Sequence, residues 1–181
     1  MSDKTRSVLY NGLIVHEHSK LSHFHEVTFC YDIIQEKSYT PQQVQSMEET
    51  RNIITGTLDD LINVNGNFVI CDKKTFNGNG YIKTRPDPQY KRQLSIYRVL
   101  LESSYGIDAR FGCLLYLDKT KDLQETPVSF ELDDLESTKQ FLKDTLEKLQ
   151  SIPEPNVCFL CNGMNKTKTI YCPYKEICQS E

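Results

Sequence analysis

Acidic residues recur on both arms of one predicted β-hairpin, near positions that should face each other. The hairpin reads GTLDDLINVNGNFVICDKKT (residues 56–75), and Asn65-Gly66 at its centre is the strongest short signal for a two-residue type I′ turn. With these two residues as the loop, Asp59 lies opposite Asp72, with Cβ atoms about 4.5–5.5 Å apart. A shift of the register by one residue would place the two acids on opposite faces of the hairpin.

Two opposed carboxylates can bind a divalent cation between them. Mg²⁺ and Mn²⁺ prefer oxygen ligands, keep several waters and can share a substrate phosphate. Such a cation lowers the pKa of a bound water and stabilises charge on a phosphodiester. Lys74 points to the same face as Asp72, because side chains two residues apart share a face of a strand. It could orient the water or stabilise the transition state. The alternative is a solvated strand end at which both acids point into water.

The elements that must position these residues alternate between helices and strands, which indicates an α/β or mixed α+β fold. The strand over residues 109–118 is apolar enough to be central in a sheet. Residues 40–52 form either a short helix or a loop, and residues 76–88 form a loop that contains glycines and prolines. Beside the hairpin, the pattern predicts helices over 7–21, 89–106 and 133–150 and strands over 26–31 and 109–118.

Composition predicts an ordinary globular chain with no membrane span. The 181 residues are 38% hydrophobic and 25% charged, and they contain no apolar run of about 18 residues. The first residues, MSDKTRSV, lack the apolar region of a signal peptide, so we expect a cytoplasmic protein. The net charge of −4 argues against a general nucleic-acid binder, but residues 72–98 are locally basic. Their basic residues are Lys73, Lys74, Lys83, Arg85, Lys91, Arg92 and Arg98.

Four of the seven cysteines are clustered near the C-terminus, after the linker-like stretch SIPEPN. They are Cys158, Cys161, Cys172 and Cys178, with the spacing C-x₂-C-x₁₀-C-x₅-C. Clustered cysteines in a cytosolic chain indicate a metal rather than disulfides. Structural zinc and a 4Fe–4S cluster both take four thiolates, and the spacing alone favours zinc. We therefore expect a core over residues 1–150 and a four-cysteine segment over 151–181.

Four short motifs resemble those of the PD-(D/E)XK nuclease superfamily and its RecB-like branch. GTLDDL and VICDKKT resemble the G-x-x-D and D-x-K motifs, QLSIY resembles Q-x-x-x-Y, and NGLIVHE resembles G-x-x-x-H-E. They occur in the order of the family and cover residues 12–97. The resemblance includes CRISPR-associated RecB-like exonucleases and the iron–sulfur nuclease domains of AddB-like helicase–nucleases. It implies a restriction-endonuclease-like α/β core with a central mixed sheet flanked by helices, and the cysteine segment packed on that core.

The resemblance also implies a role for each matching residue. From the residues alone, both His16 and Tyr97 are more often core residues, since each lies on an apolar stripe, and Asp60 is the nearest rival of Asp59. The implied metal ligands are His16, Asp59 and Asp72, the implied catalytic residues are Asp59, Asp72 and Lys74, and the implied DNA-positioning residues are Gln93 and Tyr97.

The activity that the resemblance implies is that of a Mg²⁺- or Mn²⁺-dependent deoxyribonuclease, an exonuclease on single-stranded or frayed DNA ends. CPYKEIC resembles the end of the family's iron–sulfur segment, which favours a 4Fe–4S cluster. Thr169 stands where that segment needs a cysteine, so Cys158 and Cys161 would have to complete the set. A protein partner in recombination, repair or CRISPR adaptation is expected on the same basis. The rival interpretations are a non-catalytic nucleic-acid- or protein-binding module that is stabilised by structural zinc, and a subunit of a larger nuclease.

The locally basic segment would contact DNA in the nuclease interpretation. Phosphates could be bound along it, and two aromatic residues of the predicted loop could stack on bases of a single strand. The residues for phosphates are Lys83, Arg85, Lys91 and Arg92, and those for bases are Phe76 and Tyr81.

Overall fold

The computed structural model describes residues 24–76, 85–121 and 123–151. The chain divides into two compact units, residues 1–143 and 144–181. The described part of the second unit is the end of the last helix, residues 144–151. The predicted helix over 7–21 and the four-cysteine segment lie outside the described residues, so the predicted boundary at 150–151 stays a prediction.

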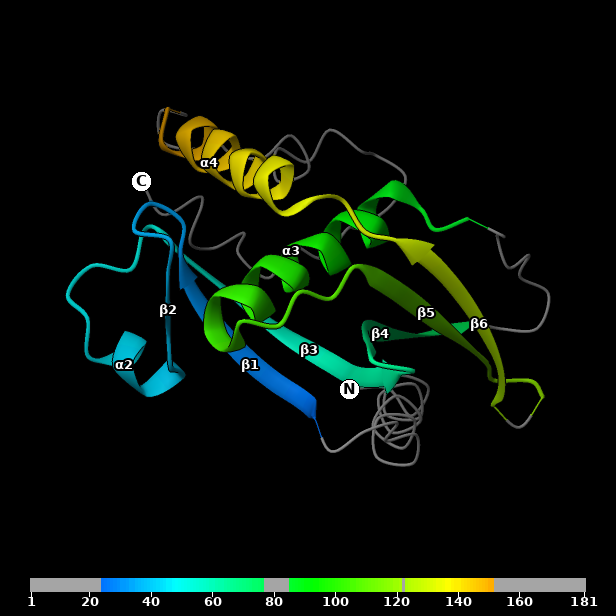
Figure 1. Ribbon diagram of the computed structural model, residues 1–181. Coiled ribbons are helices and arrows are strands. Elements are labelled where there is room, and N and C mark those ends of the chain that lie inside the picture. Colours follow the sequence, from blue (N-terminus) through cyan, green and yellow to red (C-terminus); the bar gives the residue numbers. More distant parts are fainter. Residues whose placement is uncertain (1–23, 77–84, 122, 152–181) are drawn as a thin grey trace, which may run out of the picture. The chain divides into compact units, whose positions relative to one another are not determined.

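A six-stranded mixed sheet forms the centre of the first unit (Figure 1). The strand order is β2-β1-β3-β4-β5-β6, in which β4 and β5 are parallel and every other neighbouring pair is antiparallel. This confirms the α/β class and the mixed sheet. The strands are β1 (His25–Asp32), β2 (Lys37–Tyr39), β3 (Ile53–Val64), β4 (Asn67–Phe76), β5 (Phe111–Asp118) and β6 (Gln124–Glu131), and the helices are α2 (Pro41–Gln45), α3 (Pro88–Tyr105) and α4 (Leu135–Ser151).

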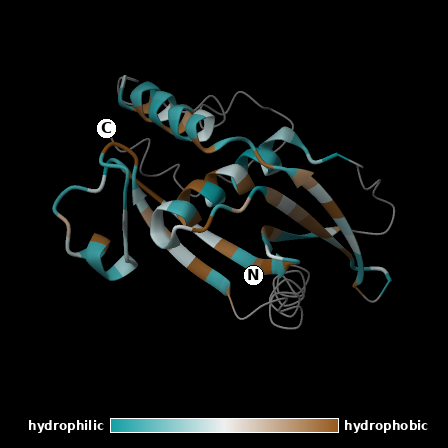
Figure 2. Ribbon diagram, in the orientation of Figure 1, coloured by the Kyte–Doolittle hydropathy of each residue, from teal (hydrophilic) through white to brown (hydrophobic). Residues whose placement is uncertain are grey.

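Most predicted elements are confirmed, and the two edge strands were missed. β1, the β3–β4 hairpin, β5, α3 and α4 lie where the sequence predicts them, and the open alternative at 40–52 contains the short helix α2. β5 lies inside the sheet, paired with β4 on one side and β6 on the other, as its apolar character predicted, and Figure 2 shows that it is more hydrophobic than α4. β6 has alternately exposed and half-buried residues and contains Pro127, which is tolerated at a sheet edge. Such a strand has little apolar signal of its own.

Helix α3 connects the parallel strands β4 and β5 and covers one face of the sheet (Figure 1). Its Leu94, Leu100 and Leu101 are fully buried. The helix ends at Gly106, which has φ 67° and donates its N–H to the carbonyl of Glu102. The sequence predicted this end, since the left-handed conformation favours glycine. None of the helices in the described residues has the length and apolar character needed to cross a membrane.

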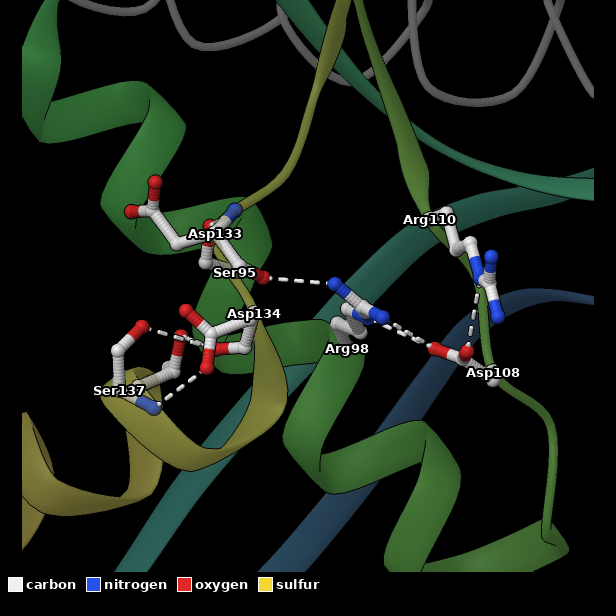
Figure 3. A network of polar contacts seen from close by, with 8 residues as sticks. Ser95, Arg98, Asp108, Arg110, Asp133, Asp134 and Ser137 are labelled. Carbon is white, nitrogen blue, oxygen red and sulfur yellow. Dashed lines mark hydrogen bonds and ion pairs between the residues drawn. The ribbon is translucent and has the colours of Figure 1, made fainter.

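Arg98 of α3 fixes the segments that follow the helix (Figure 3). Its Nε donates to Asp108 Oδ1 at 2.8 Å, and its Nη1 donates to the carbonyl of Asp133 at 2.7 Å. The N–H of Asp133 in turn donates to Ser95 Oγ at 3.0 Å. Hydrogen bonds from a charged guanidinium are stronger than neutral ones. Arg98 therefore holds the chain that leads into β5 and the chain that leads into α4, and it does not belong to a basic surface.

Candidate active site

The hairpin turn has the predicted geometry. Asn65 has φ 53° and Gly66 has φ 86°, and two successive positive φ values define a type I′ turn. The side chain of Asn63 accepts a hydrogen bond from the N–H of Gly66 at 2.8 Å. Val64 pairs with Asn67 on either side of the turn, which confirms the predicted register.

The paired register ends at Asp60–Cys71, one step before the level of Asp59 and Asp72. Here the carboxylate of Asp59 accepts a hydrogen bond from the backbone N–H of Lys73, with 2.9 Å between Lys73 N and Asp59 Oδ2. A side chain of β3 thus bonds to the main chain of β4. This bond fixes Asp59 beside the residue that follows Asp72, so both carboxylates lie at one level of the hairpin.

Lys74 pairs with Asp72 on the face of the sheet that α3 covers. Its Nζ lies 2.6 Å from Asp72 Oδ2, and its side chain is 26% exposed while that of Asp72 is 5% exposed. The ammonium also lies over the ring of Tyr90, 4.8 Å from the centroid. Burial lowers the pKa of Lys74, but the hydrogen bond and charge of Asp72, helped by Tyr90 and Asp59, raise it overall. Lys74 is therefore protonated at neutral pH.

Gln93 and Tyr97 face the same carboxylates from one turn of α3. Gln93 Nε2 donates to the hydroxyl oxygen of Tyr97 at 3.1 Å, as their i, i+4 spacing allows. The pKa of Tyr97 is raised, first by burial and then by the negative charges of Asp72 and Asp59, against the opposing effects of Gln93 and Lys74. These five predicted residues therefore form one cluster.

Gly56 has a structural role that the motif alone does not explain. A Cβ at this position would lie 2.8 Å from Cε1 of Tyr97, so only glycine lets β3 and α3 approach this closely. Gly56 and Asp59 are three residues apart in β3. Gly56 leaves room for the Tyr97 ring, and the negative charge of Asp59 raises the pKa of Tyr97. β1 is irregular at the level of Asp59, where Glu26 has φ 51°. A positive φ is uncommon for a residue other than glycine.

Tyr90 was not predicted to be part of the site. It shares an apolar stripe of α3 with Tyr97, and that stripe indicated only burial. A sequence signal existed nonetheless, because Tyr90 lies one turn before Gln93 on the same helix face.

Asp60, the sequence rival of Asp59, lies on the other face of the sheet. It pairs with Cys71, and Lys73 is two residues further along β4, so all three share a face. Lys73 Nζ lies 2.6 Å from Asp60 Oδ2, and the two side chains are 2% and 0% exposed. This buried ion pair was not predicted. It leaves Asp59 as the acid of β3 that lies beside Asp72.

The described residues of the predicted basic segment, 72–76 and 85–98, do not form one basic surface. Lys73, Lys74, Lys91 and Arg98 each pair with an aspartate, although the Lys91–Asp133 pair is partly exposed. Arg92 lies over the ring of Phe141, with 4.2 Å from its guanidinium carbon to the centroid. Arg85 is exposed, and Lys83 and Tyr81 lie outside the described residues. Phosphate contacts along this segment therefore remain predictions for Arg85, Arg92 and the partly exposed Lys91.

Asp59 and Asp72 suit Mg²⁺ or Mn²⁺ by the chemistry of their oxygen donors. Mg²⁺ is commonly bound by one or two carboxylates, with waters and substrate phosphate completing its shell. The described residues contain no group of three or more His, Cys, Asp or Glu that could hold a metal. His16, the third predicted ligand, and the four cysteines lie outside the described residues. The two aspartates therefore fit a cation site whose remaining ligands would be waters and the substrate phosphate.

Comparison with known proteins shows the family to which the chain belongs. A family model described as PD-(D/E)XK nuclease superfamily matches residues 11–179. The chain is also similar to a solved structure named "Crystal structure of SSO0001", with 24% sequence identity and a TM-score of 0.49, over 97% of this chain and 69% of that chain. No curated protein matches the chain.

Proposed function

The chain belongs to the PD-(D/E)XK nuclease superfamily, and from this premise we propose that it is a metal-dependent deoxyribonuclease. The observation that carries the proposal is the placement of Asp59, Asp72 and Lys74. Asp59 is held by the N–H of Lys73, and Asp72 is paired with Lys74, so all three lie at one end of the hairpin ladder. Two carboxylates can hold a divalent cation that supports phosphodiester hydrolysis, and an ammonium beside them can stabilise charge on the phosphate.

Each residue has a distinct part in the proposed reaction. Asp59 and Asp72 would hold Mg²⁺ or Mn²⁺, which when bound supplies an acidified water and stabilises charge on the phosphate. Lys74, whose ammonium lies beside Asp72, would stabilise negative charge on the phosphate. Gln93 and Tyr97, joined by a hydrogen bond, would position the strand beside these groups.

The finer assignment is an exonuclease of the RecB-like branch that acts on single-stranded or frayed DNA ends. The order of the four motifs supports it, and His16 of the first motif would be the third metal ligand. A cytoplasmic partner complex in recombination, repair or CRISPR adaptation is the expected setting.

The four C-terminal cysteines would bind a 4Fe–4S cluster or structural zinc. The matched family range extends to residue 179 and so includes all four, which supports a segment that belongs to the nuclease. Metal analysis and the absorption spectrum of the purified protein separate the two, since an iron–sulfur protein is brown and a zinc protein is colourless.

The test is Mn²⁺-dependent digestion of end-labelled single-stranded DNA by the wild-type protein and by Lys74→Ala. We expect the variant to lose about 10²–10³-fold in rate, the usual cost of removing a charge-stabilising group. Lys121→Ala is the matched control, because Lys121 is an exposed lysine on a surface turn. Circular single-stranded DNA tests the exonuclease mode, since it offers no end.

Failure of the folded wild-type protein to cut any DNA with Mg²⁺ or Mn²⁺ would reject the nuclease proposal. The protein would then be a binding module or a subunit that needs a partner.

A further inference from the structure

A mainly apolar groove of about 410 Å³ opens between β3 and the helices α3 and α4, beside the candidate active site. It shares two lining residues with that site, Gln93 and Tyr97. Its remaining walls include Ile54 of β3 and Ile96 and Leu100 of α3. The same tyrosine therefore faces the carboxylates and borders the groove, so a ligand in the groove would lie next to the reacting phosphate.

Two flat groups, which lie against each other, line part of the groove. The guanidinium of Arg92 lies 4.2 Å from the centroid of the Phe141 ring, and both residues line the groove. Aromatic rings and guanidinium planes are the groups on which nucleobases stack. Apolar walls that include a guanidinium plane and an aromatic ring suit a planar aromatic ligand better than a flexible chain.

The polar groups of the groove suit a base that is carried on a phosphate chain. Gln89 and Gln93 provide side-chain amides, which can donate to and accept from a base edge. Among the described residues that line the groove there is no carboxylate, and Arg92 supplies a positive charge. The volume lies in the range of small-molecule pockets.

We propose that this groove binds one unpaired nucleobase of the substrate strand, adjacent to the phosphate at Asp59 and Asp72. The inference rests on the proposed nuclease function and deepens it. A base inside a duplex is stacked and paired, so only single-stranded or frayed DNA can place a base in the groove without the cost of extrusion. The groove would thus select the substrate class.

The first experiment scans a single abasic position along a single-stranded oligonucleotide and measures the rate of cleavage at one bond. We expect one position next to the cleaved bond to lower kcat/KM about ten-fold, in line with the loss of one stacked base. Phe141→Leu keeps an apolar side chain but removes the ring, so its rates with and without that base should agree within about two-fold. Phe111→Leu is the control, because Phe111 is a partly exposed phenylalanine of β5 that does not line the groove.

The second experiment does not depend on cleavage. Lys74→Ala is mixed with oligonucleotides that carry 2-aminopurine at successive positions, and anisotropy of an end label reports total binding. We expect quenching of 2-aminopurine at one position only, and weaker quenching when Phe141→Leu is added to Lys74→Ala.

The outcomes separate this inference from the proposed function. Cleavage with a flat abasic scan and uniform fluorescence overturns the groove inference and leaves the nuclease proposal in place. Position-specific quenching without any cleavage by the wild-type protein supports the groove and rejects the nuclease proposal. Absence of DNA binding in the anisotropy measurement, together with absence of cleavage by the wild-type protein, rejects both.

Discussion

Lys73 and Lys74 are neighbours in β4, and each has its Nζ 2.6 Å from an aspartate oxygen. Their surroundings differ. The Lys73–Asp60 pair is almost completely buried, with side chains 2% and 0% exposed, whereas the lysine of the Lys74–Asp72 pair is 26% exposed and lies against Tyr90. The two pairs occupy opposite faces of one strand, because successive side chains of a strand alternate.

The difference separates a structural ion pair from one that can meet a substrate. A fully buried pair has no access to a ligand, and its charges matter chiefly to one another. The Lys74 pair keeps access to solvent and has Asp59 beside it. Lys73 connects the two faces, since its side chain pairs with Asp60 while its backbone N–H holds Asp59. Substitution of the Lys73 side chain therefore tests one face and leaves the backbone bond to the other in place.

The largest expected effect comes from breaking the buried pair. Lys73→Met removes the cation that neutralises Asp60 and should lower the free energy of unfolding by about 3–5 kcal/mol. Denaturant titration of the purified protein measures it. Lys74→Met, one residue further along, should cost less, because Lys74 is 26% exposed and its pair with Asp72 is only partly buried.

A double variant identifies the cause. Asp60→Leu combined with Lys73→Met replaces both charges and should recover most of the loss, since apolar replacements of buried pairs are commonly neutral or stabilising. A double variant as unstable as Lys73→Met alone would show that packing of the lysine chain, rather than the unbalanced charge, dominates.

The second prediction concerns the exposed face and a metal. Mg²⁺ that binds the folded protein at Asp59 and Asp72 should stabilise it, by about 2.7 kcal/mol at a concentration 100 times Kd. Thermal unfolding during a Mg²⁺ titration measures this, and Mg²⁺ avoids the cysteines because it prefers oxygen to thiolate ligands.

The Mg²⁺-dependent rise in Tm should depend only on the acids of the sheet face that carries Asp59 and Asp72. Asp59→Asn and Asp72→Asn should each weaken the Mg²⁺-dependent rise in Tm, while Glu131→Gln, at an exposed acid of the edge strand β6, should leave it unchanged. Equal stabilisation of all three variants would place the cation elsewhere in the protein.

The third prediction tests the close approach of β3 to α3. Gly56→Ala would bring its Cβ to 2.8 Å from Tyr97 Cε1 and 3.1 Å from Leu100 Cδ1, so one of these side chains has to move. Overpacking of this kind costs about 1–3 kcal/mol. Because Tyr97 faces Asp59 and Asp72, we expect DNA cleavage to fall more than stability does.

A comparison of positions makes this test specific. Gly112→Ala meets Leu94 and Leu132 at similar distances on the same sheet face, and neither of these leucines belongs to the cluster of candidate site residues. It should lose similar stability and keep the activity of its folded fraction. Equal loss of activity in the two variants would argue that Gly56 acts only through global stability.

The sequence predicted the hairpin because its cues are local. Asn65-Gly66 adopts the turn from its own backbone preferences, and a register counted from that turn brings Asp59 level with Asp72. The identity of α3 and its end at Gly106 were predictable for the same reason.

What the sequence did not predict depends on partners far apart in the chain. The edge strand β6 has little apolar signal and is defined by its pairing with β5. Asp60 and Lys73 come together only through the hairpin register, and Arg98 finds Asp108 and Asp133 only after α3 packs. A local charge count therefore predicted a basic patch, whereas tertiary pairing neutralises much of it.

The smallest expected effect comes from the Arg98–Asp108 ion pair, which tests whether burial alone distinguishes the two lysines of β4. Arg98 is 10% exposed, between Lys73 at 2% and Lys74 at 26%, whereas Asp108 at 36% is more exposed than the partner of either lysine. Burial raises the pKa of Asp108, but hydrogen bonds from Arg98 and Arg110 lower it overall.

A carboxyl whose pKa is lowered by folding contributes stability above its unfolded pKa of about 3.9, and that contribution is lost as pH falls through the folded value. Asp108→Asn should therefore cost under about 1 kcal/mol at pH 7, because solvent screens this exposed carboxylate. The difference from the wild-type protein should shrink below pH 4. Denaturant titrations at pH 7 and pH 3 measure it. A difference that persists at pH 3 would mean that Asp108 acts through hydrogen-bond geometry, which asparagine does not reproduce, rather than through charge. Burial would then be an incomplete account of why one lysine of β4 is structural and its neighbour is positioned for chemistry.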